Sequence, residues 1–265
     1  MKIDSHRNPR VVAALALRDR DARIAEQRTL VDGGRESRRA LEAGVVVDAA
    51  FICPELIRTD DAVAAVQLLA ERAAPVFEVA ERVHDHLAFG NRRDGLVLVV
   101  RTPPADLGDL QFGQDPLILV TEDVEKPGNL GAILRTADGA GCDAVIAIGG
   151  TDIFNPNVVR ASVGTVFSVP IASTTAAAAL AWLRDQGIRI LTARVDASTP
   201  YGATDLTGSV AIVLGSESDG LSTAWHDSSI EGVVIPMNGI ADSLNVSATA
   251  AILAFEARRQ RNAIQ

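Results

Sequence analysis

The sequence has few of the features that mark secreted, membrane or metal-binding proteins. It contains two cysteines in 265 residues, Cys53 and Cys142, which lie in separate apolar segments without zinc-site spacing. We therefore expect two buried thiols, with neither a disulfide nor a bound metal. No apolar run approaches the roughly 20 residues that cross a bilayer, and the start, MKIDSHRNPR, lacks the apolar core of a signal peptide. These absences predict a cytoplasmic protein without a membrane partner.

Two nucleotide-binding signatures are also absent. The chain has neither the GxGxxG loop of dinucleotide-binding domains nor the GxxxxGK[ST] loop of P-loop proteins. A dehydrogenase or another common nucleotide-binding enzyme would therefore lack its fingerprint loop. The pair His84 and His86 has the look of metal ligands, but no further His or Cys lies nearby, and we interpret ERVHDHLAFGN as a loop.

Acidic charge dominates the whole chain but not its N-terminus. The net charge of −9 argues against a protein that coats nucleic acid through bulk electrostatics. Residues 1–40, however, hold ten Lys and Arg against six Asp and Glu. Taken alone, RNPRVVAALALRDRDARIAEQRTLVDGG has the pattern of a solvated amphipathic helix.

Hydrophobic periodicity divides the chain into two α/β units. In the first, DAVAAVQLLAERA predicts a helix, and VVVDAAFI, PVFEVA and GLVLVVR predict strands. The stretch TPPADLGDLQFGQDP breaks this pattern with prolines and glycines, as linkers do. The strands LILV, AVIAI, VFSVPI, RILTARV, VAIVLG and GVVIPM then alternate with helical segments, which is typical of a parallel sheet covered on both faces. We predict a domain at 1–101, a linker at 102–115 and a second domain at 116–265.

Three loops of the second unit are candidates for a ligand site. TEDVEKPGN precedes the helix LGAILRTADGAG, SESDGLS follows the strand VAIVLG, and NGIADSLN follows VVIPM. Ligands of parallel sheets bind beyond the carboxyl ends of the strands, where such loops gather. A Gly- or Asn-bearing loop that enters a helix also leaves backbone N–H groups free for a ligand. The pattern predicts a nucleotide-like cofactor at this edge of the sheet.

Four segments resemble the successive motifs of the SpoU (TrmH-like) RNA ribose 2′-O-methyltransferases of the SPOUT superfamily. They are NLGAILRTADGAGCDAVI, RASVGTVFSVPI, IVLGSESDGLS and IPMNGIADSLNVSATAAILAFEARRQR, in the family's order, within residues 115–262. VDGGRESRRALEAG and the βα units after it resemble the small ribosomal-protein-like domain that often precedes the catalytic one. The resemblance implies an α/β fold: a C-terminal parallel-sheet domain with a deep trefoil knot, preceded by a smaller α/β RNA-binding domain.

The resemblance also implies a function. It points to a homodimeric enzyme that uses S-adenosylmethionine to methylate a ribose 2′-hydroxyl in structured RNA. The extra N-terminal domain favours 23S ribosomal RNA over tRNA, for which single-domain members are usual. An Arg-rich, Lys-poor composition is typical of high-GC genomes, where such enzymes sometimes confer antibiotic resistance, so a housekeeping and a resistance role both stay open. The alternatives are a tRNA ribose 2′-O-methyltransferase and a non-catalytic RNA-binding module, and the methylated nucleotide is not predicted.

The catalytic positions that the resemblance implies are Asn129, Arg135, Glu217, Ser243 and Asn245. Arg135 interrupts an apolar helix, where its stem could simply cover apolar surface. Because a guanidinium is a poor proton acceptor, we interpret Arg135 as stabilising the ribose alkoxide, and the role of general base stays open. Asn129 and Ser243 are also suited to helix caps.

The cofactor contacts that the resemblance implies are mostly main-chain, with the adenine ring in an apolar slot. They are expected at Thr192, Ala193, Leu214, Gly215, Glu217, Ile235, Pro236, Met237, Leu244 and Asn245. RNA phosphates are expected at Arg7, Arg10, Arg18, Arg35 and Arg160. A salt bridge is nearly as good an interpretation of Arg160.

Overall fold

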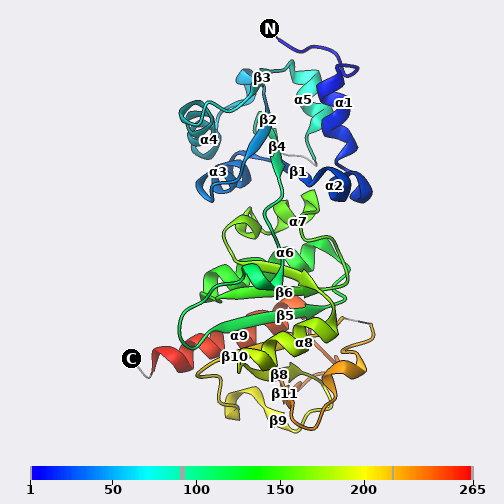
Figure 1. Ribbon diagram of the computed structural model, residues 1–265, viewed down its shortest axis with the longest axis vertical. Helices are drawn as coiled ribbons and strands as arrows, with labels where there is room; N and C mark the ends of the chain where they lie inside the picture. The colour runs from blue at the N-terminus through cyan, green and yellow to red at the C-terminus, as the bar shows by residue number, and fades with distance from the viewer. Residues whose placement is uncertain (1, 90–92, 217, 264–265) are drawn as a thin grey trace. The chain divides into compact units, whose positions relative to one another are not determined.

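The computed structural model describes residues 2–89, 93–216 and 218–263 (Figure 1). These residues form two compact units. The first comprises residues 1–103 together with 154–168, and the second comprises residues 104–153 and 169–265. The chain therefore enters the second unit, returns to the first for fifteen residues, and ends in the second.

The first unit is built on a four-stranded sheet. Its strands are β1 (Arg28–Asp32), β2 (Val47–Ile52), β3 (Val76–Glu78) and β4 (Leu96–Arg101). The order is β1-β4-β2-β3, with β4 antiparallel to β1 and β2, and β3 parallel to β2. The helices are α1 (Pro9–Ala16), α2 (Arg20–Glu26), α3 (Gly34–Glu42), α4 (Asp60–Glu71), α5 (Glu81–Leu87) and α7 (Pro156–Ala161), with 3-10 turns η1 (Pro54–Leu56) and η3 (Thr165–Phe167).

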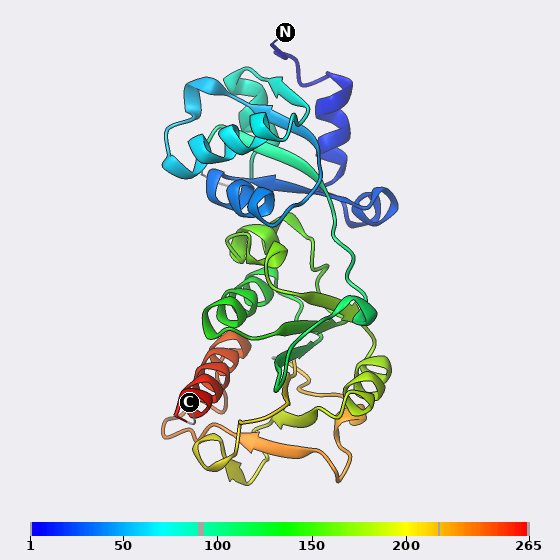
Figure 2. The same cartoon turned by 60° about the vertical axis from the view of Figure 1, so that its left-hand side comes forward.

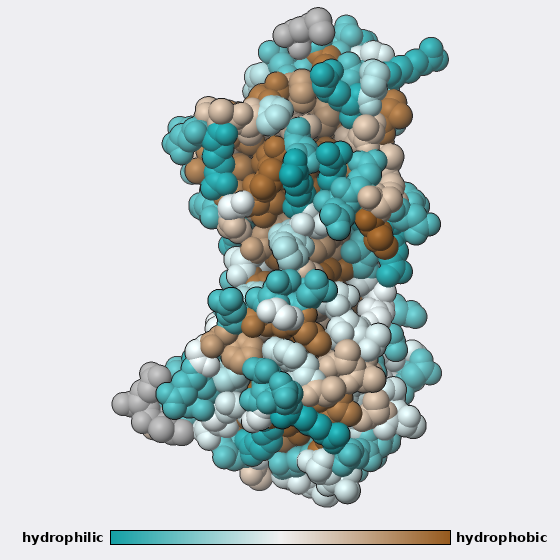
Figure 3. All heavy atoms as spheres, viewed as in Figure 1, coloured by the Kyte–Doolittle hydropathy of each residue, from teal (hydrophilic) through white to brown (hydrophobic). Residues whose placement is uncertain are grey.

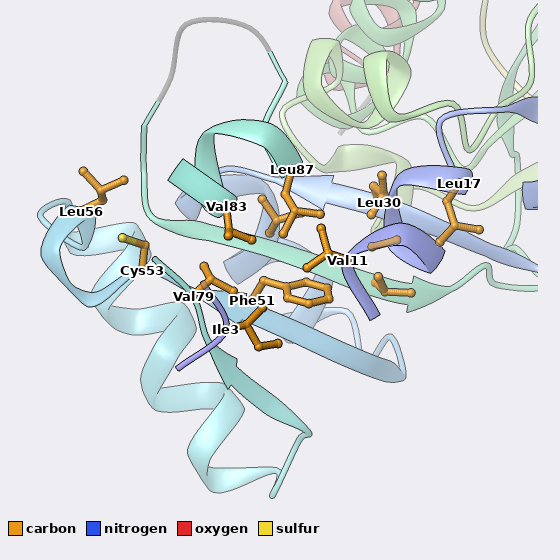
Figure 4. Packing of buried hydrophobic residues seen from close by; sticks show 13 residues of the cluster. Ile3, Val11, Leu17, Leu30, Phe51, Cys53, Leu56, Val79, Val83 and Leu87 are labelled. Atoms are coloured by element: carbon orange, nitrogen blue, oxygen red, sulfur yellow. The ribbon is translucent and has the colours of Figure 1, made fainter. Parts of the chain in front are cut away.

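One apolar core holds α1 and α5 against this sheet (Figure 4). Leu30 of β1 and Phe51 of β2 enter it from the strands, and both are fully buried. Val11 of α1 and Val83 of α5 meet them from the helices and are also fully buried. Because its apolar side chains are buried in this core, α1 is fixed to the sheet and is not a helix free in solvent.

Two segments of this unit differ from the structure that the sequence predicts. The basic segment is not one solvated helix, because it forms α1, α2 and the buried strand β1. Asp19 starts α2 by accepting hydrogen bonds from the backbone N–H groups of Asp21 and Ala22. The segment interpreted as a loop around His84 and His86 is helix α5, in which His84 is fully buried.

The second unit contains the predicted parallel sheet, which has seven strands in the order β7-β6-β5-β10-β8-β11-β9. The strands are β5 (Leu117–Glu122), β6 (Ala144–Ile148), β7 (Ile171–Thr174), β8 (Arg189–Ala193), β9 (Thr199–Pro200), β10 (Val210–Leu214) and β11 (Glu231–Val234). Every neighbouring pair is parallel. The strands β5, β6 and β10 are buried along their whole length, as expected for a sheet covered on both faces.

Helices cover both faces of this sheet. They are α6 (Pro127–Ala140), α8 (Ala176–Asp185) and α9 (Val246–Asn262), with 3-10 turns η2 (Leu107–Asp109), η4 (Tyr201–Ala203) and η5 (Thr223–Trp225). Figure 2 shows α6 (green) and α9 (red) side by side on one face and α8 (yellow-green) on the other. No helix within the described ranges has both the length and the apolar character needed to cross a membrane.

The strand predicted for VFSVPI is wrong. Residues Thr165–Phe167 form the turn η3, and β7 begins only at Ile171. The reason lies in the division of the chain, because residues up to 168 pack with the first unit and residues from 169 with the second. An apolar run that changes from one core to another cannot form a single strand.

Both cysteines are free and buried, as predicted. Burial raises the pKa of the Cys142 thiol to about 12. A thiol with so high a pKa stays protonated near neutral pH and is a poor nucleophile or metal ligand. This cysteine is therefore part of the core of the second unit.

Helix α9 is fixed to α6 by an arginine at its C-terminal half. Arg258 donates from Nε to the carbonyl of Ala140 (2.7 Å) and from Nη2 to the carbonyl of Gly141 (2.6 Å). These are the last carbonyls of α6, which have no partner within their own helix. A cation at this place satisfies the carbonyls and opposes the negative end of the helix dipole.

We predict that Arg258→Ala lowers the free energy of unfolding of the second unit by about 1–3 kcal/mol, because two carbonyl bonds and a favourable charge are lost. Both tryptophans, Trp182 and Trp225, lie in this unit, so urea denaturation followed by tryptophan fluorescence reports it. The control is Arg259→Ala, which removes the ion pair of an exposed guanidinium with Glu256 on the same helix and should change the midpoint much less. Equal midpoints for the two variants would contradict the prediction.

Candidate active site

The loops after β8, β10 and β11 line a cavity of about 490 Å³. A cavity of this size suits a cofactor such as a nucleoside derivative. Six of the ten residues expected to hold the cofactor line it: Ala193, Leu214, Gly215, Ile235, Met237 and Leu244. The expected catalytic residue Ser243 lines it as well.

The other four expected cofactor residues are placed differently. Thr192 is fully buried in β8, where its hydroxyl donates to the carbonyl of Glu231 (3.2 Å). Pro236 and Asn245 are not among the described lining residues. Glu217, expected in both the catalytic and the cofactor sets, lies outside the described residues.

The charges of this cavity fit S-adenosylmethionine, whose sulfonium and ammonium groups outweigh its carboxylate. Asp196, Asp219 and Asp242 contribute carboxylates, and Arg194 is the only Lys or Arg among its described lining residues. The Arg194 guanidinium lies 3.2 Å from the Asp196 carboxylate. Apolar side chains such as Leu214 complete a wall suitable for adenine. Within the described part of the chain, no three His, Cys, Asp or Glu side chains form a metal-binding group.

The loop after β10 folds back tightly on itself. Ser216 and Gly220 exchange two backbone hydrogen bonds, of 3.0 Å and 3.2 Å. A Cβ atom on Gly215 would lie 2.3 Å from the backbone carbon and oxygen of Gly220. Position 215 therefore has to be glycine for the loop to keep this shape.

One residue that holds this loop was not predicted from the sequence. Glu122, at the end of β5, is 3% exposed and accepts two hydrogen bonds from Ser222. The two residues lie 100 positions apart, so no local pattern connects them. A lone acidic residue at the end of an otherwise apolar strand was the only available signal.

A smaller cavity of about 260 Å³ adjoins the first. Asn129 and Lys126 line it, together with Ser216, Ser218 and Val246, which also line the larger cavity. The shared walls place an acceptor group in the smaller cavity next to a cofactor in the larger one. This adjacency is what a direct transfer between two bound molecules requires.

Two expected catalytic residues meet beside the smaller cavity. The amide nitrogen of Asn245 donates to the amide oxygen of Asn129 (3.2 Å). Asn245 also caps α9, because its side-chain oxygen accepts from the Ser247 backbone N–H (2.9 Å). The cap interpretations of Asn129 and Ser243 are wrong: Asn129 is the third residue of α6, and the cap of α9 is Asn245.

Arg135 lies on α6, six residues after Asn129 and thus about 9 Å further along the helix axis. Its side chain is exposed and forms no hydrogen bond or ion pair with the described residues. The other described members of the catalytic set do not bind it. An exposed, uncommitted guanidinium is available to an anionic ligand such as RNA phosphate.

Two of the arginines expected to bind RNA hold the chain around Phe89. Arg18 donates to the carbonyls of His86, Leu87 and Ala88, and its guanidinium lies 4.9 Å from the centre of the Phe89 ring. Arg160 donates to the Phe89 carbonyl. Both arginines thus have structural partners within the first unit.

The other three arginines expected to bind RNA differ in the partners of their side chains. Arg10 lies 4.7 Å from the centre of the Phe77 ring, and Arg35 pairs with Asp61 at 3.2 Å. Arg7 is exposed, and its side chain has no such partner among the described residues. Figure 3 shows hydrophilic side chains interspersed with apolar ones on the visible face of the first unit. Binding of RNA by these five arginines stays a prediction.

The chain is similar to known RNA methyltransferases. The model of the SpoU rRNA methylase family matches residues 116–255, and that of the MRM3-like substrate binding domain matches residues 8–97. The chain is 36% identical over 197 residues to the 23S rRNA (guanosine-2′-O-)-methyltransferase RlmB of Vibrio vulnificus, covering 71% of this chain and 79% of that one.

Two solved structures resemble both units together. The crystal structure of an RNA 2′-O ribose methyltransferase matches with a TM-score of 0.86 and 37% identity, covering 98% of this chain and 99% of that one. The S-adenosylmethionine-bound rRNA methyltransferase of Sinorhizobium meliloti matches with a TM-score of 0.88 and 28% identity, covering 98% and 97%.

We predict that Gly215→Ala raises the dissociation constant for S-adenosylmethionine about ten- to hundredfold, because overpacking of this kind costs about 1–3 kcal/mol and displaces the loop. Isothermal titration calorimetry measures the change. Gly202→Ala is the control, since a Cβ atom there meets nothing within 4 Å. Unaltered affinity in the Gly215 variant would show that the loop does not shape the cofactor site.

Proposed function

Because the chain belongs to the SpoU rRNA methylase family, we propose that it methylates a ribose 2′-hydroxyl of 23S ribosomal RNA with S-adenosylmethionine as methyl donor. The observation that carries this proposal is the pair of adjoining cavities, one lined by the Gly loops and the other by Asn129. The relative from Vibrio vulnificus, whose name specifies 23S rRNA, supports the choice of RNA.

The larger cavity is the proposed cofactor site. Its backbone-rich loops hold the nucleoside, and the carboxylates of Asp219 and Asp242 favour the positive charge of the ligand. Bound S-adenosylmethionine supplies an electrophilic methyl group on a sulfonium. The remaining requirements fall on the protein: it has to place the ribose oxygen in line with that methyl group and stabilise the oxygen as it loses its proton.

The target ribose is proposed to lie beside the smaller cavity. The bonded amides of Asn129 and Asn245 orient it, and Ser243 borders the larger cavity next to them. Arg135 binds the neighbouring phosphate or the ribose and stabilises the alkoxide. With S-adenosylmethionine in the larger cavity supplying the methyl group, these side chains would hold the ribose 2′-oxygen in line with it.

The first unit is proposed to bind the RNA substrate. Its match to a substrate-binding family model supports this role. Among the five arginines expected to bind RNA, Arg7 is the one whose exposed side chain has no partner within the described residues. We propose a domain at 1–101, a linker at 102–115 and a catalytic domain at 116–265, of which residues 154–168 group with the first unit. An enzyme of ribosomal RNA acts where ribosomes are assembled, so we propose a cytoplasmic location.

The catalytic domain is proposed to carry the deep trefoil knot of its superfamily. In the sheet order, β10 lies between β5 and β8, although the chain visits β5 and β8 first. The tight approach of Gly215 to Gly220 is compatible with close passage of backbone segments.

We also propose that the protein is a homodimer that pairs through α9. Ala248, Ile252 and Phe255 follow one another at helical spacing on this helix, and Phe255 is 51% exposed. An exposed phenylalanine in an apolar stripe is typical of a helix that packs against a partner.

We predict that the wild-type enzyme transfers labelled methyl groups to 23S rRNA rather than to tRNA, and that Arg135→Ala lowers kcat at least about a hundredfold. The helix tolerates alanine, so S-adenosylmethionine binding should be retained. Arg135→Lys should recover little, since a point charge does not reproduce the planar fork. Turnover near wild type in the alanine variant would remove Arg135 from the reaction.

We predict that Phe255→Glu converts the dimer to monomer, because a charge would be buried in the apolar interface. Sedimentation velocity without RNA measures the mass. Val63→Glu on α4 is the matched control, since Val63 is a 43% exposed apolar residue outside the proposed interface. A dimer that survives Phe255→Glu would place the interface elsewhere.

A further inference from the structure

A buried carboxylate joins two strand ends at the active site. Glu122 is the last residue of β5, and its side chain reaches the chain that follows β10. One carboxylate oxygen accepts from the backbone N–H of Ser222 (2.7 Å), and the other accepts from the Ser222 hydroxyl (2.8 Å). Glu122 is 97% buried, and both of its carboxylate oxygens therefore accept hydrogen bonds from the same residue, Ser222.

Ser222 lies where the loop after β10 returns to the body of the unit. The loop leaves the strand at Gly215, folds back through the paired backbone groups of Ser216 and Gly220, and reaches Ser222. Three residues later, at the end of η5, Trp225 is fully buried. The returning part of the loop is therefore held by the packing of Leu221 against the core and by the bonds of Ser222 to the Glu122 carboxylate.

The backbone that follows Glu122 is held in place by the neighbouring strand and loop. The backbone N–H of Asp123 bonds to the carbonyl of Ile148 (2.8 Å). Gly150 packs so closely that an added Cβ atom would lie 2.6 Å from the carbonyl oxygen of Val124. Glu122 therefore projects from a fixed position, and the loop is the part that would move if the contact were lost.

The loop that Glu122 holds borders both cavities. Ser216 and Ser218 line the larger and the smaller cavity alike. Glu122 itself lines neither among the described residues, so it would act through Ser222 rather than on a ligand. A displaced loop would widen the cofactor cavity and change its wall.

We propose that Glu122 is a positioning residue that, through its paired bonds to Ser222, holds residues 218–222 in place at the wall of the cofactor cavity. This inference rests on the proposed function, since it assigns the larger cavity to S-adenosylmethionine. Its effect is on cofactor affinity: residues 218–221 form part of the binding wall before the cofactor arrives, and the cofactor does not have to order them.

The test compares Ser222→Ala, Glu122→Ala and Glu122→Gln in the full-length enzyme. We expect Ser222→Ala to raise the dissociation constant for S-adenosylmethionine about three- to tenfold, and Glu122→Ala to raise it more than about tenfold. Glu122→Gln should recover most of the affinity, because its amide oxygen accepts from the Ser222 N–H while its amide nitrogen donates to the Ser222 hydroxyl. Ser209→Ala is the control, a serine of the same unit outside both cavities.

Steady-state kinetics separate positioning from folding. A positioning role predicts a higher KM for S-adenosylmethionine with kcat at saturating cofactor within about twofold of wild type. A purely structural role would lower kcat by reducing the amount of folded enzyme and would leave KM unchanged. Should Glu122→Ala fail to fold, Ser222→Ala still decides the matter, because Ser222 is exposed and small.

A double-mutant cycle tests whether Glu122 affects cofactor affinity through Ser222. If Glu122 acts through Ser222, adding Ser222→Ala to Glu122→Ala should not weaken cofactor binding further. Additive losses, or wild-type affinity in both single variants, would overturn the inference. If the wild-type protein itself failed to bind S-adenosylmethionine, the proposed function would fall instead.

Discussion

The active site depends on the docking of α9 alongside α6. Asn245 at the start of α9 bonds to Asn129 near the start of α6, and Arg258 near the end of α9 bonds to the last carbonyls of α6. The two helices therefore run in the same direction. Their positive N-terminal ends meet beside the smaller cavity, where the reaction would develop negative charge on the ribose oxygen.

Parallel helices of this kind carry an electrostatic cost, because like ends of two dipoles lie together. Arg258 offsets that cost at the C-terminal end by placing a cation on the carbonyls of α6. At the N-terminal end the two amides meet, and a bound phosphate or alkoxide would add the opposite charge. The parallel packing of α6 and α9 therefore costs stability in the free protein, and the same packing favours the negative charge of the transition state.

The sequence predicted the parts of the molecule that rest on local pattern. Short Val, Ile and Leu runs identified β5, β6 and β10, and the loops after these strands led to six of the cofactor-site residues. It missed β1, a five-residue strand with too little alternation to stand out from the helices before it. It also missed Glu122, because the partner of that carboxylate is distant in the chain. Charge counting overstated the free cations at the N-terminus, since Arg18 bonds to backbone carbonyls and Arg35 pairs with Asp61.

The most direct test of the account is the identity of the methylated product. The enzyme is incubated with 23S rRNA and labelled S-adenosylmethionine, the RNA is digested to nucleosides, and the labelled nucleoside is identified by mass spectrometry. The account predicts one nucleoside in which the methyl group is on the ribose 2′-oxygen. A label found on a base, or on no nucleoside of 23S rRNA, would contradict it.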